Sequence, residues 1–191
     1  MASTQPGQRR QQILEALAEM LEQPKGDKIT TAALARKLEF SEAALYRHFA
    51  SKAQMFEGLI EFIEATVFGL INQIAEREED GLAQARGIVA MLLQFASSNP
   101  GMTRVLIGDA LVNEDERLQA RMNQFYDRVE LALKQALRLA ASEGRGHEAD
   151  VAARAAMLVS YVAGRWHRYA KSGFKLNPAQ DAAVQISLLL N

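Results

Sequence analysis

Residues 29–52 read ITTAALARKLEFSEAALYRHFASK, and this segment decides the fold of the chain. Two short apolar-periodic stretches are separated by a break at Glu39 and Phe40, and a hydroxyl residue, Thr30 or Ser41, precedes each stretch. Because Ser and Thr are favoured N-cap residues, the pattern predicts two short helices, the second over residues 42–49. A short helix supporting a second one across a tight break is the layout of a helix-turn-helix, whose second helix enters the DNA major groove.

The apolar residues of this segment have the spacing needed to fix the angle between its two helices. They are Leu34, Ala35, Leu38, Phe40, Leu45 and Phe49. The residues left to face outward from the second helix are Glu42, Ala43, Tyr46 and Arg47. We therefore expect the second helix to present a small, mixed surface to DNA.

Each predicted DNA contact has a chemical reason. Thr30 and Ser41 stand at helix N-termini, where backbone amides and the helix dipole favour a phosphate oxygen. The methyl groups of Ala43 and Ala44 suit close approach to base edges, and Arg47 has the donors needed to read guanine. The complete predicted DNA-binding set is Thr30, Thr31, Ser41, Ala43, Ala44, Tyr46, Arg47, His48 and Lys52.

Three of these residues have an ordinary structural alternative. Tyr46 can plug the small core instead of contacting phosphate, and His48 can cap or pack. Lys52, which begins the next helix, can be a solvated lysine. The sequence leaves these alternatives open.

Helical periodicity continues on both sides of the segment, so the fold class is all-α. A first helix is predicted over residues 8–22 and ends at Pro24 and Gly26. Further helices are predicted over residues 52–75, 82–97, 103–107, 114–141, 148–171 and 178–190. The inward stripe of the helix over 52–75 is expected to contain Met55, Phe56, Leu59, Phe62, Ile63, Val67 and Ile71.

Composition limits the classes of protein that this chain can represent. The 191 residues include 49% apolar residues, 4 Pro and no Cys, and the formal charge is −1. A chain of this size can bury a core without disulfides or metals. A slight basic excess in residues 1–52 and an acidic excess in residues 53–191 neither prove nor exclude DNA binding. No apolar run approaches the ~20 residues that span a bilayer, and no signal-peptide core is seen, so we expect a cytoplasmic protein with no membrane partner.

The sequence carries no pattern of a catalytic, metal or cofactor site. The absence of Cys excludes a thiolate zinc site and a Cys nucleophile. His147 and His167 lack a ligand-spaced partner, and neither a Gly-rich phosphate loop nor a Gly-x-Ser-x-Gly elbow occurs. We expect no enzyme activity and no cofactor.

The last two predicted helices are unusually apolar and rich in small residues. This excess includes Val151, Ala152, Ala155, Ala156, Leu158, Val159, Val162, Ala163, Ala182, Ala183, Ile186, Leu188, Leu189 and Leu190. Since small residues allow close helix approach, a symmetric homodimer can bury the excess in a four-helix interface. An internal core without a dimer is the alternative.

The segment closely resembles the DNA-binding module of TetR-type regulators. The shared features are Tyr46, the pair His48-Phe49, the pair Ser51-Lys52, Arg9-Arg10 ahead of the first helix and Thr30-Thr31. The resemblance implies a helix-turn-helix domain over residues 1–52 and a larger helical domain over residues 53–191 that dimerises through its last two helices. Glu39 departs from the glycine that is usual in the family's turn. Either Glu39 keeps a left-handed backbone, which costs about 1 to 2 kcal/mol, or the geometry of the turn has shifted.

Further blocks resemble one branch of that family, the nucleoid-occlusion factors. They are SEAALYRHF, LIEFIE, Asn99 to Arg104, Arg117 to Arg121, Arg168-Tyr169 and Phe174-Lys175. The resemblance implies a nucleoid-associated homodimer on palindromic DNA that, when DNA-bound, antagonises ring assembly by the division protein FtsZ. It also implies that Phe62, Met91 and Asn99 hold the FtsZ C-terminal tail.

The implied tail-binding groove departs from the enterobacterial pattern at three positions. Leu70 and Ser98 stand where that pattern has arginines, and Gln94 stands where it has glycine. Because each exposed charge pair contributes at most about 1 kcal/mol, losing two cations weakens attraction for an acidic peptide. The alternative function is a transcriptional repressor released from its operator by a small molecule, and it requires an enclosed, partly polar pocket in the second domain.

Overall fold

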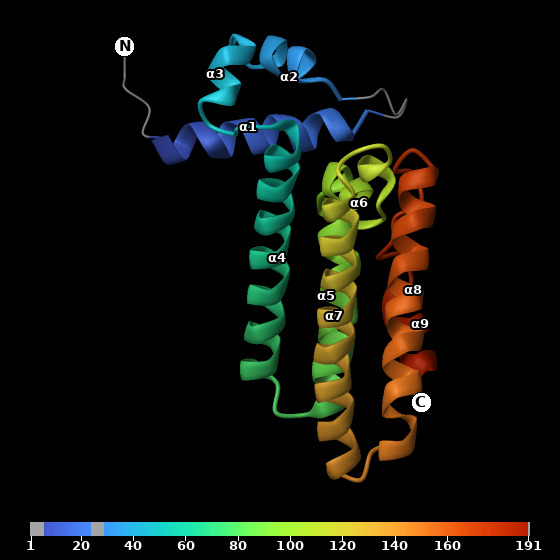
Figure 1. Ribbon diagram of the computed structural model, residues 1–191. Coiled ribbons are helices and arrows are strands. Elements are labelled where there is room, and N and C mark those ends of the chain that lie inside the picture. Colours follow the sequence, from blue (N-terminus) through green and yellow to red (C-terminus); the bar gives the residue numbers. More distant parts are fainter. Residues whose placement is uncertain (1–5, 24–28, 191) are drawn as a thin grey trace.

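The computed structural model describes residues 6–23 and 29–190, and every regular element in these ranges is a helix. Figure 1 shows two parts: α1, α2 and α3 form a head that lies across the top, and long helices run down from it as the body. The head helices are α1 (Pro6–Leu21), α2 (Thr31–Lys37) and α3 (Glu42–Tyr46). The body contains α4 (Lys52–Arg77), α5 (Gly81–Ser98), α6 (Pro100–Leu106), η1 (Asp109–Leu111), α7 (Glu116–Ser142), η2 (Glu148–Asp150), α8 (Val151–Lys171) and α9 (Ala182–Leu190).

The predicted helices are all present, with differences at their ends that have local causes. Pro100 supplies the first residue of α6, so this helix begins three residues earlier than predicted. Asp181 has a left-handed φ of 57°, and α9 therefore begins only at Ala182, not at Pro178. The short 3-10 turns η1 and η2 carry no sequence pattern that we recognised. Pro24 and Gly26, predicted to end the first helix, lie outside the described residues.

The predicted helix caps are confirmed, and the backbone at Glu39 decides between the two alternatives left open for the turn. Thr30 Oγ1 accepts a hydrogen bond from the Ala33 amide at 3.1 Å, and Ser41 Oγ accepts one from the Ala44 amide at 3.2 Å. Glu39 has a φ of 57°, the left-handed conformation that glycine adopts more easily. The turn therefore keeps the backbone geometry of a helix-turn-helix at the expense of local strain.

Helix α3 ends at Tyr46, three residues before the predicted end at Phe49. Groups outside α3 satisfy the backbone beyond it: Arg10 Nη1 donates to the His48 carbonyl at 2.6 Å, and the Ala50 amide donates to Gln54 Oε1 at 2.9 Å. The Arg10 guanidinium also lies 4.1 Å from the centre of the Phe49 ring. The His48 and Phe49 amides still donate to the Leu45 carbonyl at 2.9 and 3.1 Å, so contacts from α1 and α4 add to a short turn that follows α3.

Helix α4 joins the head and the body because its apolar stripe is buried against both of them. Met55, Phe56 and Leu59 are buried near the head, and Ile63, Val67 and Ile71 are buried further down. The prediction that Phe62 belongs to this inward stripe is wrong, since its side chain is 47% exposed. Ile60, fully buried, completes the stripe instead, because the two residues between Ile60 and Phe62 turn the side chain by about 200° around the helix.

By length and hydropathy alone, α4 is the one described helix that is apolar enough to cross a membrane. Its environment explains this apolarity, because α4 packs against α1, α5 and α7. A helix that contacts elements on several sides needs more apolar surface than a surface helix does. We therefore interpret α4 as a core helix, in agreement with the sequence prediction.

The head is seated on the body by a close approach between α1 and α6. A Cβ atom built on Gly101 of α6 would lie 1.9 Å from the carbonyl oxygen of Ala18 in α1. Only glycine permits this approach, since non-bonded carbon and oxygen atoms do not come so close. Gly101 therefore fixes how the head lies on the body.

Aromatic side chains pack together inside the body. Phe68, Phe125, Tyr126 and Trp166 form a chain of ring contacts, with centroids 5.4 to 6.1 Å apart. Trp166 Nε1 donates to the Leu92 carbonyl at 3.1 Å, and the Tyr126 hydroxyl donates to the Leu106 carbonyl at 2.9 Å. Burial raises the pKa of Tyr126 to about 12, so its hydroxyl stays a donor at neutral pH.

Gly101→Ala is expected to lower the free energy of unfolding by about 1 to 3 kcal/mol, because the new methyl group forces α1 away from α6. Gly69→Ala is the matched control, since Gly69 lies inside α4 with no neighbour within 4 Å of the new methyl. That control should gain about 0.5 to 1 kcal/mol from helix propensity. Urea unfolding measures both, and a Gly101→Ala variant as stable as the parent would contradict this account of the head's seating.

Candidate nucleic-acid interface

The predicted DNA-contact residues of α3 lie on its exposed side. Ala43, Tyr46 and Arg47 are exposed, Ala44 and His48 are half-buried, and Leu45 and Phe49 are buried. Tyr46 is 44% exposed, so it does not plug the small core. The outward face is therefore the one that the sequence predicted.

The capping geometry leaves two hydroxyl protons available. Thr30 and Ser41 use their side-chain oxygens as acceptors for the backbone amides of Ala33 and Ala44. A hydroxyl that accepts in this way still has one O–H to donate. Both residues are exposed, so each can donate that proton to a phosphate while its oxygen continues to cap a helix.

Thr31 is engaged differently from Thr30. Its Oγ1 donates to Glu42 Oε2 at 2.7 Å, and the Tyr46 hydroxyl donates to Thr31 Oγ1 at 3.5 Å. Since a hydroxyl has a single proton, Thr31 can approach a phosphate as a donor only by leaving Glu42. Sequence reasoning missed this network, because the partners lie on different helices and no periodicity links them.

Lys52 is held by two groups in the body. Its ammonium forms an ion pair with Glu114, which precedes α7, and it lies 5.7 Å from the centre of the Phe56 ring. The side chain is 22% exposed, so Lys52 is not the freely solvated lysine of the alternative reading. Glu114 is a functional candidate that the sequence did not single out, because it lies 62 residues further along the chain.

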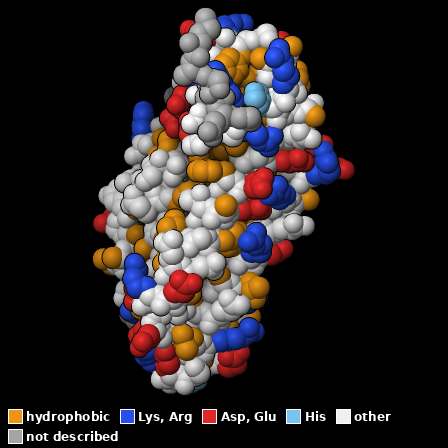
Figure 2. Space-filling view, turned by 90° about the vertical axis from the view of Figure 1, so that its left-hand side faces the viewer, with side chains coloured by type: hydrophobic (Ala, Val, Ile, Leu, Met, Phe, Trp, Pro, Cys, Tyr) orange, Lys and Arg blue, Asp and Glu red, His pale blue; other side chains and the backbone are white. Residues whose placement is uncertain are grey.

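The residues expected to form the partner groove come from two helices that pack together. Phe62 lies on α4, Met91 on α5 and Asn99 at the end of α5, and α4 packs against α5. Asn99 Nδ2 donates to the Phe95 carbonyl at 2.8 Å, and Met91 is half-buried. Figure 2 shows the face on which α4 lies: hydrophobic side chains are interspersed with charged ones of both signs.

Helices α8 and α9 carry exposed apolar residues at helical spacing. Met157 on α8 and Val184 and Leu188 on α9 are exposed, Leu188 by 75%. Small residues surround Met157 on α8: Ala152, Ala153, Ala156, Ser160 and Gly164, all exposed. These eight residues form what we call the α8–α9 face.

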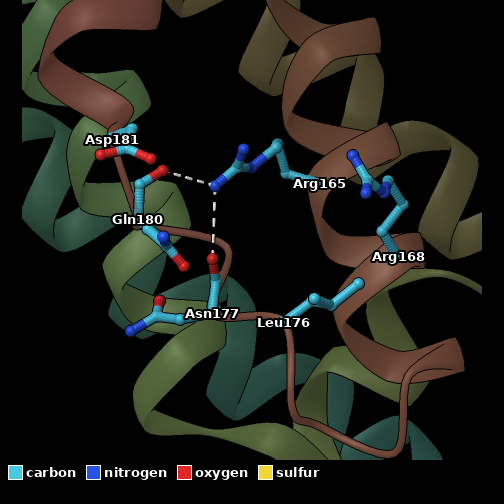
Figure 3. Close-up of a pocket in the computed structure, with 6 residues that line it drawn as sticks. All are labelled: Arg165, Arg168, Leu176, Asn177, Gln180 and Asp181. Atoms are coloured by element: carbon cyan, nitrogen blue, oxygen red, sulfur yellow. Dashed lines mark hydrogen bonds between the residues drawn. The ribbon is translucent and has the colours of Figure 1, made fainter.

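Arg165 fixes the connection that leads into α9. Its guanidinium donates to the carbonyl oxygens of Asn177, Pro178 and Gln180 at 2.6 to 3.2 Å, and Figure 3 shows the bonds to Asn177 and Gln180. The same guanidinium donates to Gln185 Oε1 on α9 at 3.0 Å. Next to Arg165, a hollow of about 190 Å³ lies between α8 and this connection, and Arg168 and Asp181 also line it. Arg165 therefore fixes the position of α9 relative to α8.

Among residues 6–23 and 29–190, no group of three or more His, Asp or Glu side chains is arranged to hold a metal ion. The predicted contact residues of α2, α3 and the start of α4 supply hydroxyls, a guanidinium, an imidazole, an ammonium and methyl groups, and the carboxylate of Glu42 lies beside them. This is the chemistry of a surface that contacts phosphates and base edges.

Two family models match separate parts of the chain. Residues 13–59 match the family described as bacterial regulatory proteins, tetR family, and residues 79–191 match the SlmA-like family described as the tetracyclin repressor-like, C-terminal domain. A TetR-type regulator from Haloarcula marismortui superposes with a TM-score of 0.81 at 17% identity, covering 96% of this chain and 97% of that one. FadR from Bacillus subtilis in complex with stearoyl-CoA gives 0.77 at 13% identity, covering 95% and 97%. Fold and head together define a TetR-type, non-enzymatic DNA-binding protein.

Sequence comparison identifies the branch of that class. The nucleoid occlusion factor SlmA of Alteromonas mediterranea is 50% identical over 182 residues, covering 95% of this chain and 93% of the relative. SlmA of Aliivibrio fischeri is 49% identical over 183 residues, with the same coverage. The chain belongs to the SlmA family of nucleoid occlusion factors. Membership implies a DNA-binding protein, as expected from the sequence.

Paired substitutions in the head separate base reading from phosphate attraction. Arg47→Ala is expected to cost about 1 to 3 kcal/mol on the cognate duplex and little on a random one, if Arg47 binds guanine through two hydrogen bonds. Lys52→Ala should weaken binding to both duplexes similarly and reduce the slope of log K against log salt by about one. Fluorescence anisotropy at several salt concentrations measures both, and equal losses for Arg47→Ala on the two duplexes would refute its assignment.

Proposed function

We propose that the chain acts as a homodimer on palindromic chromosomal sites and, when DNA-bound, antagonises FtsZ ring assembly over the nucleoid. Membership of the SlmA family carries the proposal. In this proposal residues 1–52 bind DNA, and residues 53–191 dimerise and bind the partner. The DNA-binding set is Thr30, Thr31, Ser41, Ala43, Ala44, Tyr46, Arg47, His48 and Lys52.

The α8–α9 face supports the homodimer. Exposed Met157, Val184 and Leu188 lie among small residues that let a second copy of these helices approach closely. A twofold dimer buries the same face on both copies and presents two α3 helices. For α3 to enter successive major grooves, the two copies must lie roughly 34 to 36 Å apart, which requires a palindromic site.

Exposed Phe62 supports partner binding at the α4–α5 groove. An aromatic side chain left 47% exposed on a core helix is a suitable anchor for a peptide. Met91 and Asn99 border the same pair of helices. Leu70, Gln94 and Ser98 supply no cation there, and Gln94 Nε2 donates to Ser98 Oγ at 3.2 Å, so binding of an acidic tail rests mainly on apolar contact.

The packed aromatic side chains inside the body favour this function over release from DNA by a small molecule. Ligand-responsive regulators need an enclosed site with a few polar groups inside. Here the aromatic chain from Phe68 to Trp166 occupies the interior between α4, α5, α7 and α8, and the polar groups of Tyr126 and Trp166 are bonded to backbone carbonyls.

FtsZ polymer assembly tests the proposed function. A cognate duplex is first selected from a randomised pool, and FtsZ polymers are then sedimented with GTP, the protein and that duplex. We expect the complex to reduce pelleted FtsZ, and Phe62→Ala to restore it while leaving DNA affinity unchanged, because Phe62 is exposed and lies outside the head. Undiminished polymer at saturating complex would remove the FtsZ-directed part of the proposal.

The dimer is tested by a charge on the α8–α9 face. Leu188→Glu places an unpaired carboxylate in the proposed interface twice, so the dimer dissociation constant should rise by roughly a hundredfold or more. Leu131→Glu is the control, since Leu131 is an exposed leucine on α7 that does not belong to the eight residues of that face. Analytical ultracentrifugation reads both, and an unchanged Leu188→Glu dimer would show that the copies associate elsewhere.

A further inference from the structure

Three ion-paired contacts join α4 to α7 or to the connection before α7. Arg121 pairs with Glu64 at 2.7 Å, Arg117 pairs with Glu57 at 3.8 Å, and Lys52 pairs with Glu114. Arg117 also pairs with Asp115 at 2.8 Å, which lowers the pKa of Asp115 to about 2. The three contacts follow one another along α4 from its first residue.

The Lys52–Glu114 pair differs from the other two because its carboxylate residue does not belong to a helix. Glu57, Glu64, Arg117 and Arg121 all belong to long helices, so packing of α4 on α7 keeps these pairs together. Glu114 belongs instead to the connection between η1 and α7. The preceding residue, Asn113, has a left-handed φ of 64°, and the Glu114 amide donates to the Leu111 carbonyl at 3.0 Å.

The Lys52–Glu114 pair is largely shielded from solvent. The Glu114 side chain is 13% exposed and that of Lys52 is 22% exposed, so water screens their attraction less than it screens an exposed pair. Lys52 follows Ser51, the N-cap of α4, directly after the head. Glu114 of the body is therefore an anion that can compete with DNA phosphate for Lys52, the first residue of α4.

We propose that Glu114 is a positioning residue for DNA binding: it holds Lys52 in the free protein, and a DNA phosphate displaces it in the complex. The inference rests on the proposed phosphate contact of Lys52. A phosphate and a carboxylate compete for the same ammonium, and DNA offers a dense array of phosphates. DNA occupancy thereby frees Glu114 and loosens the connection before α7.

Two consequences follow from this exchange. Glu114 lowers the affinity for DNA of any sequence, although it lies outside the head. The state of the connection before α7 also depends on whether DNA is bound, because the same carboxylate cannot be paired with Lys52 when phosphate has taken its place.

The affinity test uses Glu114→Gln, which keeps the shape of the side chain and removes its charge. We expect about two- to fivefold tighter binding to cognate and random duplexes alike, the range for loss of one modest ion pair. Asp109→Asn is the matched control: it removes one charge from the chain between α6 and α7, but its partner is Lys171 on α8. That control should leave DNA affinity within experimental error of the parent.

A double-mutant cycle separates competition for Lys52 from a general electrostatic effect. In a Lys52→Met background, Glu114→Gln should no longer change DNA affinity, because the group for which Glu114 competes is gone. Equal tightening with and without Lys52 would overturn the proposal. So would an unchanged affinity of Glu114→Gln in the parent background.

Hydrogen exchange of the Glu114 amide measures the displacement of Glu114 directly. A pair with only a structural role would show no change in this exchange on DNA binding. Adding cognate duplex should speed exchange at this amide in the parent protein. In Glu114→Gln, exchange should already be fast without DNA and should change little on binding. If the parent binds duplex and exchange at residues 111–115 is unaffected, the displacement is wrong while DNA binding stands; if the parent binds no duplex, the proposed function itself fails.

Discussion

The structure depends on the shared burial of the first turns of α4. Gly58 of α4 lets Phe49 of the head and Leu14 of α1 come within 3.1 to 3.3 Å of where a Cβ would stand, and Met55, Phe56 and Leu59 are buried beside it. Further down the same helix, Ile63 and Val67 are buried in the body. Because one rigid helix belongs to both cores, the position of the head follows the position of α4.

This constraint explains how the proposed DNA and partner sites relate to each other. Lys52 is the first residue of α4, and Phe62 lies ten residues later, roughly 15 Å along the helix axis at a rise of 1.5 Å per residue. In this proposal DNA and the FtsZ tail contact the same helix, at its first residue and near its middle. In the proposed dimer, the distance between the two α3 helices depends on how α8 and α9 of the two copies pack, since α4 packs against α7 and α7 packs against α8.

Features that depend on nearby residues could be predicted from the sequence. The caps at Thr30 and Ser41 and the outward side of α3 each follow from a few neighbouring residues, whereas the sequence left the backbone of Glu39 open between two alternatives. Features that depend on contacts between distant segments could not. The outward position of Phe62, the short α3 held by Arg10, and the Lys52–Glu114 pair all arise from tertiary packing, which periodicity does not record.

Hydroxyl-radical footprinting of the protein on a selected duplex tests the central claim most directly, that a twofold assembly places two α3 helices in successive major grooves. The account predicts two protected stretches on each strand, related by twofold symmetry and separated by about one helical turn, 10 to 10.5 base pairs, or a multiple of it. A single protected stretch, or protection without twofold symmetry, would contradict it.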